Sequence, residues 1–132
     1  MTRFAAFALA LTALPLAAAA QDVDCSKADT QVEMTTCAEQ DWNAADARLN
    51  TAYKAVVATM KEIDANLDAG DRGAEDALRS GQRAWITYRD QTCAAEGWTA
   101  HGGSAEPMII YACRARVTDA RAEELENMAS GD

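Results

Sequence analysis

A long apolar stripe with helical spacing constrains this chain more than any other feature of its sequence. Between Trp42 and Leu67, apolar side chains recur every three or four residues and return to one face of a helix. Ahead of the stripe, residues 30–33 (Thr-Gln-Val-Glu) have the form of a capping box, which marks a helix start. The spacing therefore predicts one long helix that begins there and ends between Asn66 and Gly70. The stripe consists of Trp42, Ala45, Leu49, Ala52, Val56, Met60, Ile63 and Leu67.

Two shorter helices are expected after it. The first runs from about Ala74 to Ala95, and a loop from Gly97 to Ser104 separates it from another that opens near Pro107, a residue suited to a first helical turn. No segment alternates apolar and polar residues in a strand-like period. The sequence predicts an all-α fold, a small antiparallel three-helix bundle with a long first helix. The expected inner residues are Leu78, Gly81, Trp85, Tyr88 and Thr92, then Met108, Tyr111, Ala115, Thr118, Ala122, Leu125 and Met128.

Glycine destabilises the middle of a helix, so we expect Gly81 to have a packing role there. We expect a large side chain of the first helix to approach it closely, because glycine opens room where helices cross.

The first 20 residues have the features of a signal peptide. Arg3 supplies a positive charge, Phe4 to Leu16 are apolar, and Ala18-Ala19-Ala20 form a small-residue cleavage site before Gln21. The apolar part is too short to span a bilayer comfortably, and the first cysteine, Cys25, does not directly follow it as a lipid anchor would require. We therefore expect a signal peptide at 1–20 and one domain at 21–132, periplasmic or secreted and without a membrane anchor after cleavage.

The four cysteines predict a disulfide framework. An even number of cysteines in a small exported domain is typical of disulfide-bonded proteins, and four cysteines allow three pairings. Cys25 and Cys37 are 12 residues apart and Cys93 and Cys113 are 20 apart, so the local pairing is the simplest. A four-cysteine metal site is the alternative, but it lacks a C-x-x-C pair and an oxidising compartment disfavours it. We expect two disulfides and no metal.

The net charge of the chain limits which kinds of molecule it is expected to bind. The formal net charge is −9, and loss of a leader that carries Arg3 and no acid makes the mature chain one unit more negative. Polyanion binding requires a cationic face, so nucleic acid is excluded as an expected partner. A basic protein, in contrast, would be attracted.

Catalytic motifs are not found in the sequence. His101 is the only histidine, and a Cys-His nucleophile would require Cys93 or Cys113 to be a free thiolate, which export disfavours. The sequence has no H-E-x-x-H, G-x-S-x-G, phosphate-binding glycine loop or C-x-x-C-H motif. We expect neither enzymatic activity nor a cofactor.

Several blocks together resemble a known family. They are Cys37-Ala38, the eight residues from Asp46 to Tyr53, the nine residues from Gln82 to Asp90, Cys93, Gly103-Ser104, and Cys113 with Arg121 and Leu125. In this order they look like the LprI-like lysozyme-inhibitor domain family, with an A-W-x-x-[FY]-R-D block followed by cysteine as the most specific part. The resemblance implies a secreted helical domain with paired cysteines that inhibits lysozyme.

Most residues of these blocks also have a structural explanation. Leu49, Tyr53, Trp85 and Tyr88 have the spacing of a core. Arg89 lies next to that stripe, and Asp46 or Asn50 of the facing helix would satisfy its charge and fix the helix register. A contact to a partner is the alternative role for these three polar residues.

The loop from Glu96 to Glu106 is the candidate binding site. A Cys93–Cys113 disulfide would clamp its base, and a constrained loop lowers the ordering cost of association. Trp98, His101 and Ser104 are the expected partner-binding residues, unless Trp98 folds back as a lid over the core.

The favoured function is an exported protein-binding inhibitor of a lysozyme-type glycosidase, with a basic lysozyme as the expected partner. A structural or adaptor domain of the cell envelope, with a different protein partner, is the alternative. A small-molecule or metal-binding module is a third class, for which the sequence shows no cluster of ligands.

Overall fold

The computed structural model of the protein describes residues 23–131. The expected signal peptide and its cleavage point before Gln21 lie outside the described residues. The chain forms helix α1 (Gln31–Ala65), helix α2 (Ala74–Gly97), a single 3₁₀ turn η1 (Trp98–Ala100) and helix α3 (Glu106–Ser130). The described part holds no strand, which confirms the all-α prediction.

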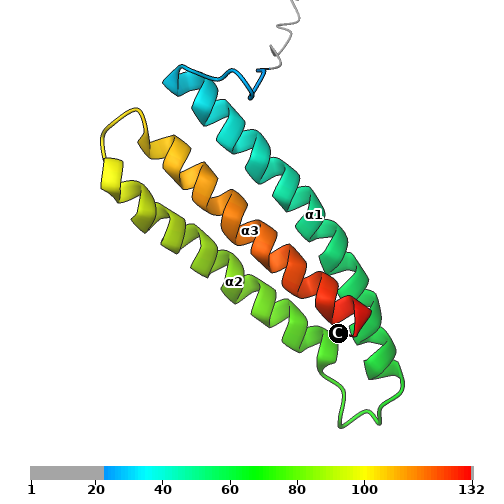
Figure 1. The fold of residues 1–132 in the computed structure, drawn as a ribbon. Coiled ribbons are helices and arrows are strands. Elements are labelled where there is room, and N and C mark those ends of the chain that lie inside the picture. The colour runs from blue at the N-terminus through cyan, green and yellow to red at the C-terminus, as the bar shows by residue number, and fades with distance from the viewer. Residues whose placement is uncertain (1–22, 132) are drawn as a thin grey trace, which may run out of the picture.

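The helices form an up-down-up bundle in which α1 and α3 run in the same direction and α2 runs opposite to both (Figure 1). At 1.5 Å per residue, the 35 residues of α1 span about 50 Å. The core lies where all three helices meet, and Val56, Ala122 and Leu125 are fully buried there. Burial of apolar area at this junction is the main term that holds the bundle together.

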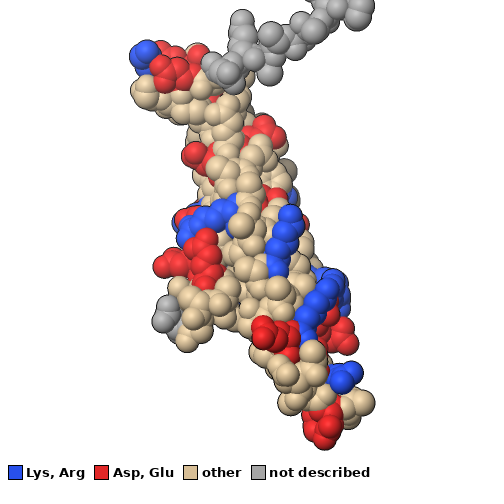
Figure 2. All heavy atoms as spheres, turned by 90° about the vertical axis from the view of Figure 1, so that its right-hand side faces the viewer, with Lys and Arg blue, Asp and Glu red and all other residues tan. Residues whose placement is uncertain are grey.

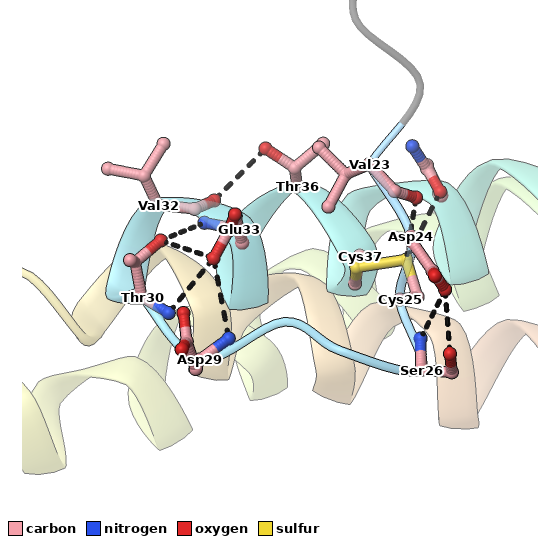
Figure 3. Close-up of a disulfide and its surroundings, with 11 residues drawn as sticks. Val23, Asp24, Cys25, Ser26, Asp29, Thr30, Val32, Glu33, Thr36 and Cys37 are labelled. Carbon is pink, nitrogen blue, oxygen red and sulfur yellow. Dashed lines mark hydrogen bonds between the residues drawn. A yellow bond between two sulfur atoms is a disulfide. The ribbon is translucent and has the colours of Figure 1, made fainter.

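Helix α1 begins as predicted. The Thr30 hydroxyl accepts a hydrogen bond from the Glu33 backbone N–H at 3.2 Å, and the Glu33 carboxylate accepts one from the Thr30 N–H at 3.0 Å (Figure 3). The helix ends at Ala65, with Asn66 as its C-cap. The buried part of the stripe is shorter than predicted, since Ile63 and Leu67 remain 43% and 39% exposed. The last turn of α1 therefore extends beyond the bundle core.

The buried face of α2 differs from the predicted one. Gly81 is exposed and Tyr88 is 59% exposed, whereas Gln82 and Arg89, one residue later in each case, are buried. Two polar side chains take these inner positions because each finds hydrogen-bond partners there and buries an aliphatic stem. The predicted close approach at Gly81 is wrong, because a Cβ at this position would meet nothing within 4 Å.

The close approach occurs instead at Gly97, the last residue of α2. A Cβ on Gly97 would lie 2.5 Å from Cγ1 of Ile110 on α3, so only glycine fits without displacing that side chain. This contact sets the separation of α2 and α3 at the end where the two helices are joined.

A carboxylate of α1 caps the start of α2. The N-cap residue, Gly73, has no side chain to offer, and the Asp64 carboxylate accepts hydrogen bonds from the N–H groups of Gly73, Ala74 and Glu75 at 2.8, 2.9 and 3.0 Å. These three bonds favour the ionised form, so they lower the pKa of Asp64. The contact fixes the turn between α1 and α2.

The two disulfides are those that the local spacing predicted. Cys25 is bonded to Cys37 and Cys93 to Cys113, with Cα–Cα distances of 5.6 and 5.4 Å. The first ties the segment that precedes α1 back onto that helix (Figure 3). The second is buried and joins α2 to α3.

Candidate functional site

The connection between α2 and α3 lies at the end of the bundle where α1 begins (Figure 1). We call this connection, residues 98–105, the tip. Trp98 is 64% exposed, and its indole stacks on the imidazole of His101 with ring centroids 3.8 Å apart and planes at 20°. Trp98 is therefore no lid over the core. The tip presents two aromatic rings to solvent as one surface.

Glu106, at the start of α3, orders the tip. One of its carboxylate oxygens accepts a hydrogen bond from the Gly102 N–H at 2.8 Å, and the other lies 3.1 Å from His101 Nδ1. The bond from the backbone and then that from the imidazole lower the pKa of Glu106. Gly102 has a φ of 76°, a left-handed conformation that glycine adopts without strain. The carboxylate thereby fixes both the backbone of the tip and its imidazole.

Contacts between α2 and α3 hold the base of the tip. The Cys93–Cys113 disulfide is buried there, and Gly97 packs against Ile110 one turn farther on. On the surface, Arg116 forms an ion pair with Glu96 at 2.9 Å. The aromatic pair is thus mounted on a covalently closed frame and not on a free loop.

Ser104 contributes to a different part of the same end. Together with Pro107 it lines a shallow hollow of about 300 Å³ whose other wall is the first turns of α1. Val32 of α1 also lines it and is 76% exposed. Sequence reasoning missed Val32, because its place in the capping box suggested only a helix start.

Arg89 lies inside the bundle, with its side chain 10% exposed. Its Nε donates to the Asp90 carboxylate at 3.0 Å, and its Nη1 lies 3.9 Å from Asp46 of α1. Asn50 donates to the other oxygen of Asp46 at 2.8 Å. The three predicted polar residues are therefore brought together, with Asp90 as an additional partner that was not predicted.

Two tryptophans surround the same guanidinium. Its central carbon lies 5.2 Å from the ring centroid of Trp85 and 5.7 Å from that of Trp42, within the range of cation–π attraction. Trp42 also stacks on Tyr111 of α3 at 5.7 Å. Arg89 thereby links all three helices.

Residues 23–125 match the model of the family described as lysozyme inhibitor LprI. The chain belongs to this family. Its description is that of an inhibitor domain.

Relatives of this LprI-family chain include two curated proteins and one solved structure. An uncharacterized protein of Rhizobium meliloti (strain 1021) is 45% identical over 117 residues, which cover 86% of this chain and 84% of that protein. The uncharacterized protein YecT of Escherichia coli (strain K12) is 31% identical over 49% of this chain and 41% of its own length. A crystal structure of a DUF1311 family protein from Pseudomonas putida KT2440 has a TM-score of 0.65 and 23% identity, over 80% of this chain and 98% of that one. This last likeness shows the shared fold.

None of the helices within residues 23–131 is long and apolar enough to cross a membrane. Within the same range, no three His, Cys, Asp or Glu side chains are grouped so that they would hold a metal ion. Both disulfides fit an oxidising compartment, as does membership of an inhibitor family.

Proposed function

We propose that this LprI-family domain is an exported inhibitor that binds a lysozyme-type glycosidase through its tip. The observation that carries the proposal is the exposed Trp98–His101 pair on a frame closed by the Cys93–Cys113 disulfide. An exposed tryptophan is unusual on a monomer, and tryptophan is enriched among residues that dominate binding energy at interfaces.

The tip has side chains suited to the active-site cleft of a lysozyme-type glycosidase. Glycosidases of this class place two carboxylates on either side of the scissile bond. In its protonated form, the His101 ring donates from Nε2–H to such a group while Nδ1–H stays bonded to Glu106, and the indole of Trp98 fills apolar space beside it. Because Glu106 and the disulfide already order the tip, little conformational entropy is lost on binding.

Charge supports a basic partner. The formal net charge of the chain is −9. On the face drawn in Figure 2, acidic and basic side chains are interspersed, so that face carries no continuous basic surface. Long-range attraction to a cationic lysozyme raises the rate of encounter.

The test is inhibition of cell-wall lysis by a basic lysozyme, followed as loss of turbidity. The wild-type protein is expected to slow lysis, and Trp98→Ala to lose most of this effect. Tyr88→Ala is the matched control, because Tyr88 is an aromatic of similar exposure (59%) on the outer face of α2. A protein that binds no lysozyme and leaves lysis unchanged would favour the envelope adaptor function instead.

A further inference from the structure

A groove between α1 and α2, away from the tip, is lined almost entirely by residues of the blocks that carry the family resemblance. Its volume is about 370 Å³. All but one of its lining residues come from two sequence blocks, 46–53 on α1 and 82–90 on α2, and the exception is Arg79. The inhibitor function proposed for the tip does not use this groove.

One of the arginines that line the groove is left without an ion pair. Three arginines and a single carboxylate, that of Asp46, line it, although the whole chain has a formal net charge of −9. Arg79 is neutralised by Glu75 at 2.5 Å, and Arg89 by Asp90 and Asp46. The guanidinium of Arg83 has no ion pair or hydrogen bond with any residue from 23 to 131. It is exposed and available to a ligand.

The floor of the groove offers unused hydrogen-bond donors. Gln82 is only 9% exposed, and its side-chain oxygen accepts a hydrogen bond from Arg121 Nε at 3.2 Å. That bond orients the amide and leaves its NH₂ group without a partner among the described residues. The rings of Tyr53 and Trp85 provide apolar surface beside it. Because this NH₂ group is open to solvent, an acceptor on a ligand can reach it.

We propose that this groove binds an extended acidic peptide segment of a protein partner. The α2 wall runs from Arg79 to Arg89, which is about 15 Å along a helix and matches four to five residues of extended chain. A carboxylate of the segment pairs with Arg83, since guanidinium and carboxylate form two parallel hydrogen bonds. A backbone carbonyl accepts from the Gln82 amide, and an apolar side chain packs on Tyr53 and Trp85.

The experiment uses a five-residue peptide, acetylated and amidated, in which glutamate alternates with leucine. Its matched control peptide carries glutamine in place of each glutamate. Calorimetric titration of the full mature protein is expected to show saturable binding of the glutamate peptide and at least tenfold weaker binding of the glutamine peptide. Arg83→Gln is expected to weaken the glutamate peptide about tenfold or more.

Lys54→Gln is the matched control variant, because it removes one exposed positive charge of α1 that does not line the groove. It is expected to leave binding within twofold of wild type. Equal losses in Arg83→Gln and Lys54→Gln would reduce the effect to net charge and overturn the proposal. Saturable binding of an oligoglucuronate in place of the peptide would also overturn it, in favour of a glycan ligand. Neither result bears on lysozyme inhibition at the tip, which the lysis assay tests separately.

Discussion

The indole of Trp98 lies 3.8 Å from the imidazole of His101, centroid to centroid, and the imidazole in turn contacts the carboxylate of Glu106 at 3.1 Å. Each group in this series is held by the next, and the last belongs to the first turn of α3. The exposed aromatic surface is therefore positioned by a helix and not by the loop alone. Removal of one member leaves its neighbour without support.

Substitution at the tip should shorten the lifetime of the complex with a basic lysozyme. Trp98→Ala or His101→Ala is expected to raise the dissociation rate about tenfold or more and to change the association rate little, as interface substitutions usually do. Surface plasmon resonance against immobilised lysozyme measures both rates. An unchanged dissociation rate in both variants would show that the tip is not the contact surface.

Salt should change the association rate and leave the dissociation rate nearly unaffected, the reverse of what the tip substitutions do. An increase from about 10 mM to 150 mM shortens the Debye length from roughly 30 Å to 8 Å, so attraction between an acidic inhibitor and a basic enzyme is screened. We expect the association rate to fall markedly while the dissociation rate changes little. Complete loss of binding at moderate salt, in wild type and tip variants alike, would indicate only nonspecific charge attraction.

Acid should loosen the tip. The pKa of Glu106 is lowered from its usual 4.5 by the bond from Gly102 and by the contact with His101, so the ionised form is the one that the folded tip favours. Its contribution to stability is complete above pH 4.5 and is lost as the pH falls through the lowered value. The protection factor of the Gly102 amide, the ratio of its intrinsic to its observed exchange rate by NMR, is expected to fall in that window. Glu106→Gln should keep an acceptor for Gly102 and show no such acid-dependent step.

The fold was predictable from the sequence wherever local chemistry acts alone. The capping box at residues 30–33, the apolar stripe of α1 and the local cysteine spacing all depend on residues close in the chain. The buried face of α2 was not predictable in this way, because Gln82 and Arg89 occupy inner positions only through partners on other helices or on the surface. The periodicity of apolar residues alone placed Gly81 and Tyr88 there.

The candidate site, too, was predictable only in part, because long-range packing determines which residues it brings together. Trp98, His101 and Ser104 were identifiable as residues of one loop, but the structure separates Ser104 from the aromatic pair and places it beside Val32. Val32 and Ser104 are separated by 71 residues of sequence, and only the packing of α3 against α1 brings them together. Asp64 was equally hidden, since it caps a helix other than its own.

Two glycine substitutions should have opposite effects on stability. Gly81→Ala places a methyl group in open space on the exposed side of α2 and is expected to stabilise the protein by about 0.5–1 kcal/mol, because alanine is the better helix former. Gly97→Ala forces its Cβ against Ile110 and is expected to cost about 1–3 kcal/mol. Urea unfolding measures both. Two changes of the same sign would contradict the assigned position of the α2–α3 contact.

The role of Arg89 can be separated from that of a binding residue. Its guanidinium is buried between two tryptophans and beside two carboxylates that are themselves 43% and 42% exposed. In Arg89→Ala these carboxylates stay hydrated. The protein therefore loses only the packing of the arginine stem and the cation–π contacts, and we expect its free energy of unfolding to fall by about 2–4 kcal/mol. Arg89→Lys should recover part of it, since lysine keeps the charge but not the planar stacking. Arg83→Ala, on the same helix but exposed, should stay within about 0.5 kcal/mol of wild type in stability.

Lysozyme inhibition by folded Arg89→Ala should match wild type, because the tip lies farther along the bundle. An unchanged unfolding midpoint together with lost inhibition would instead assign Arg89 to the partner contact.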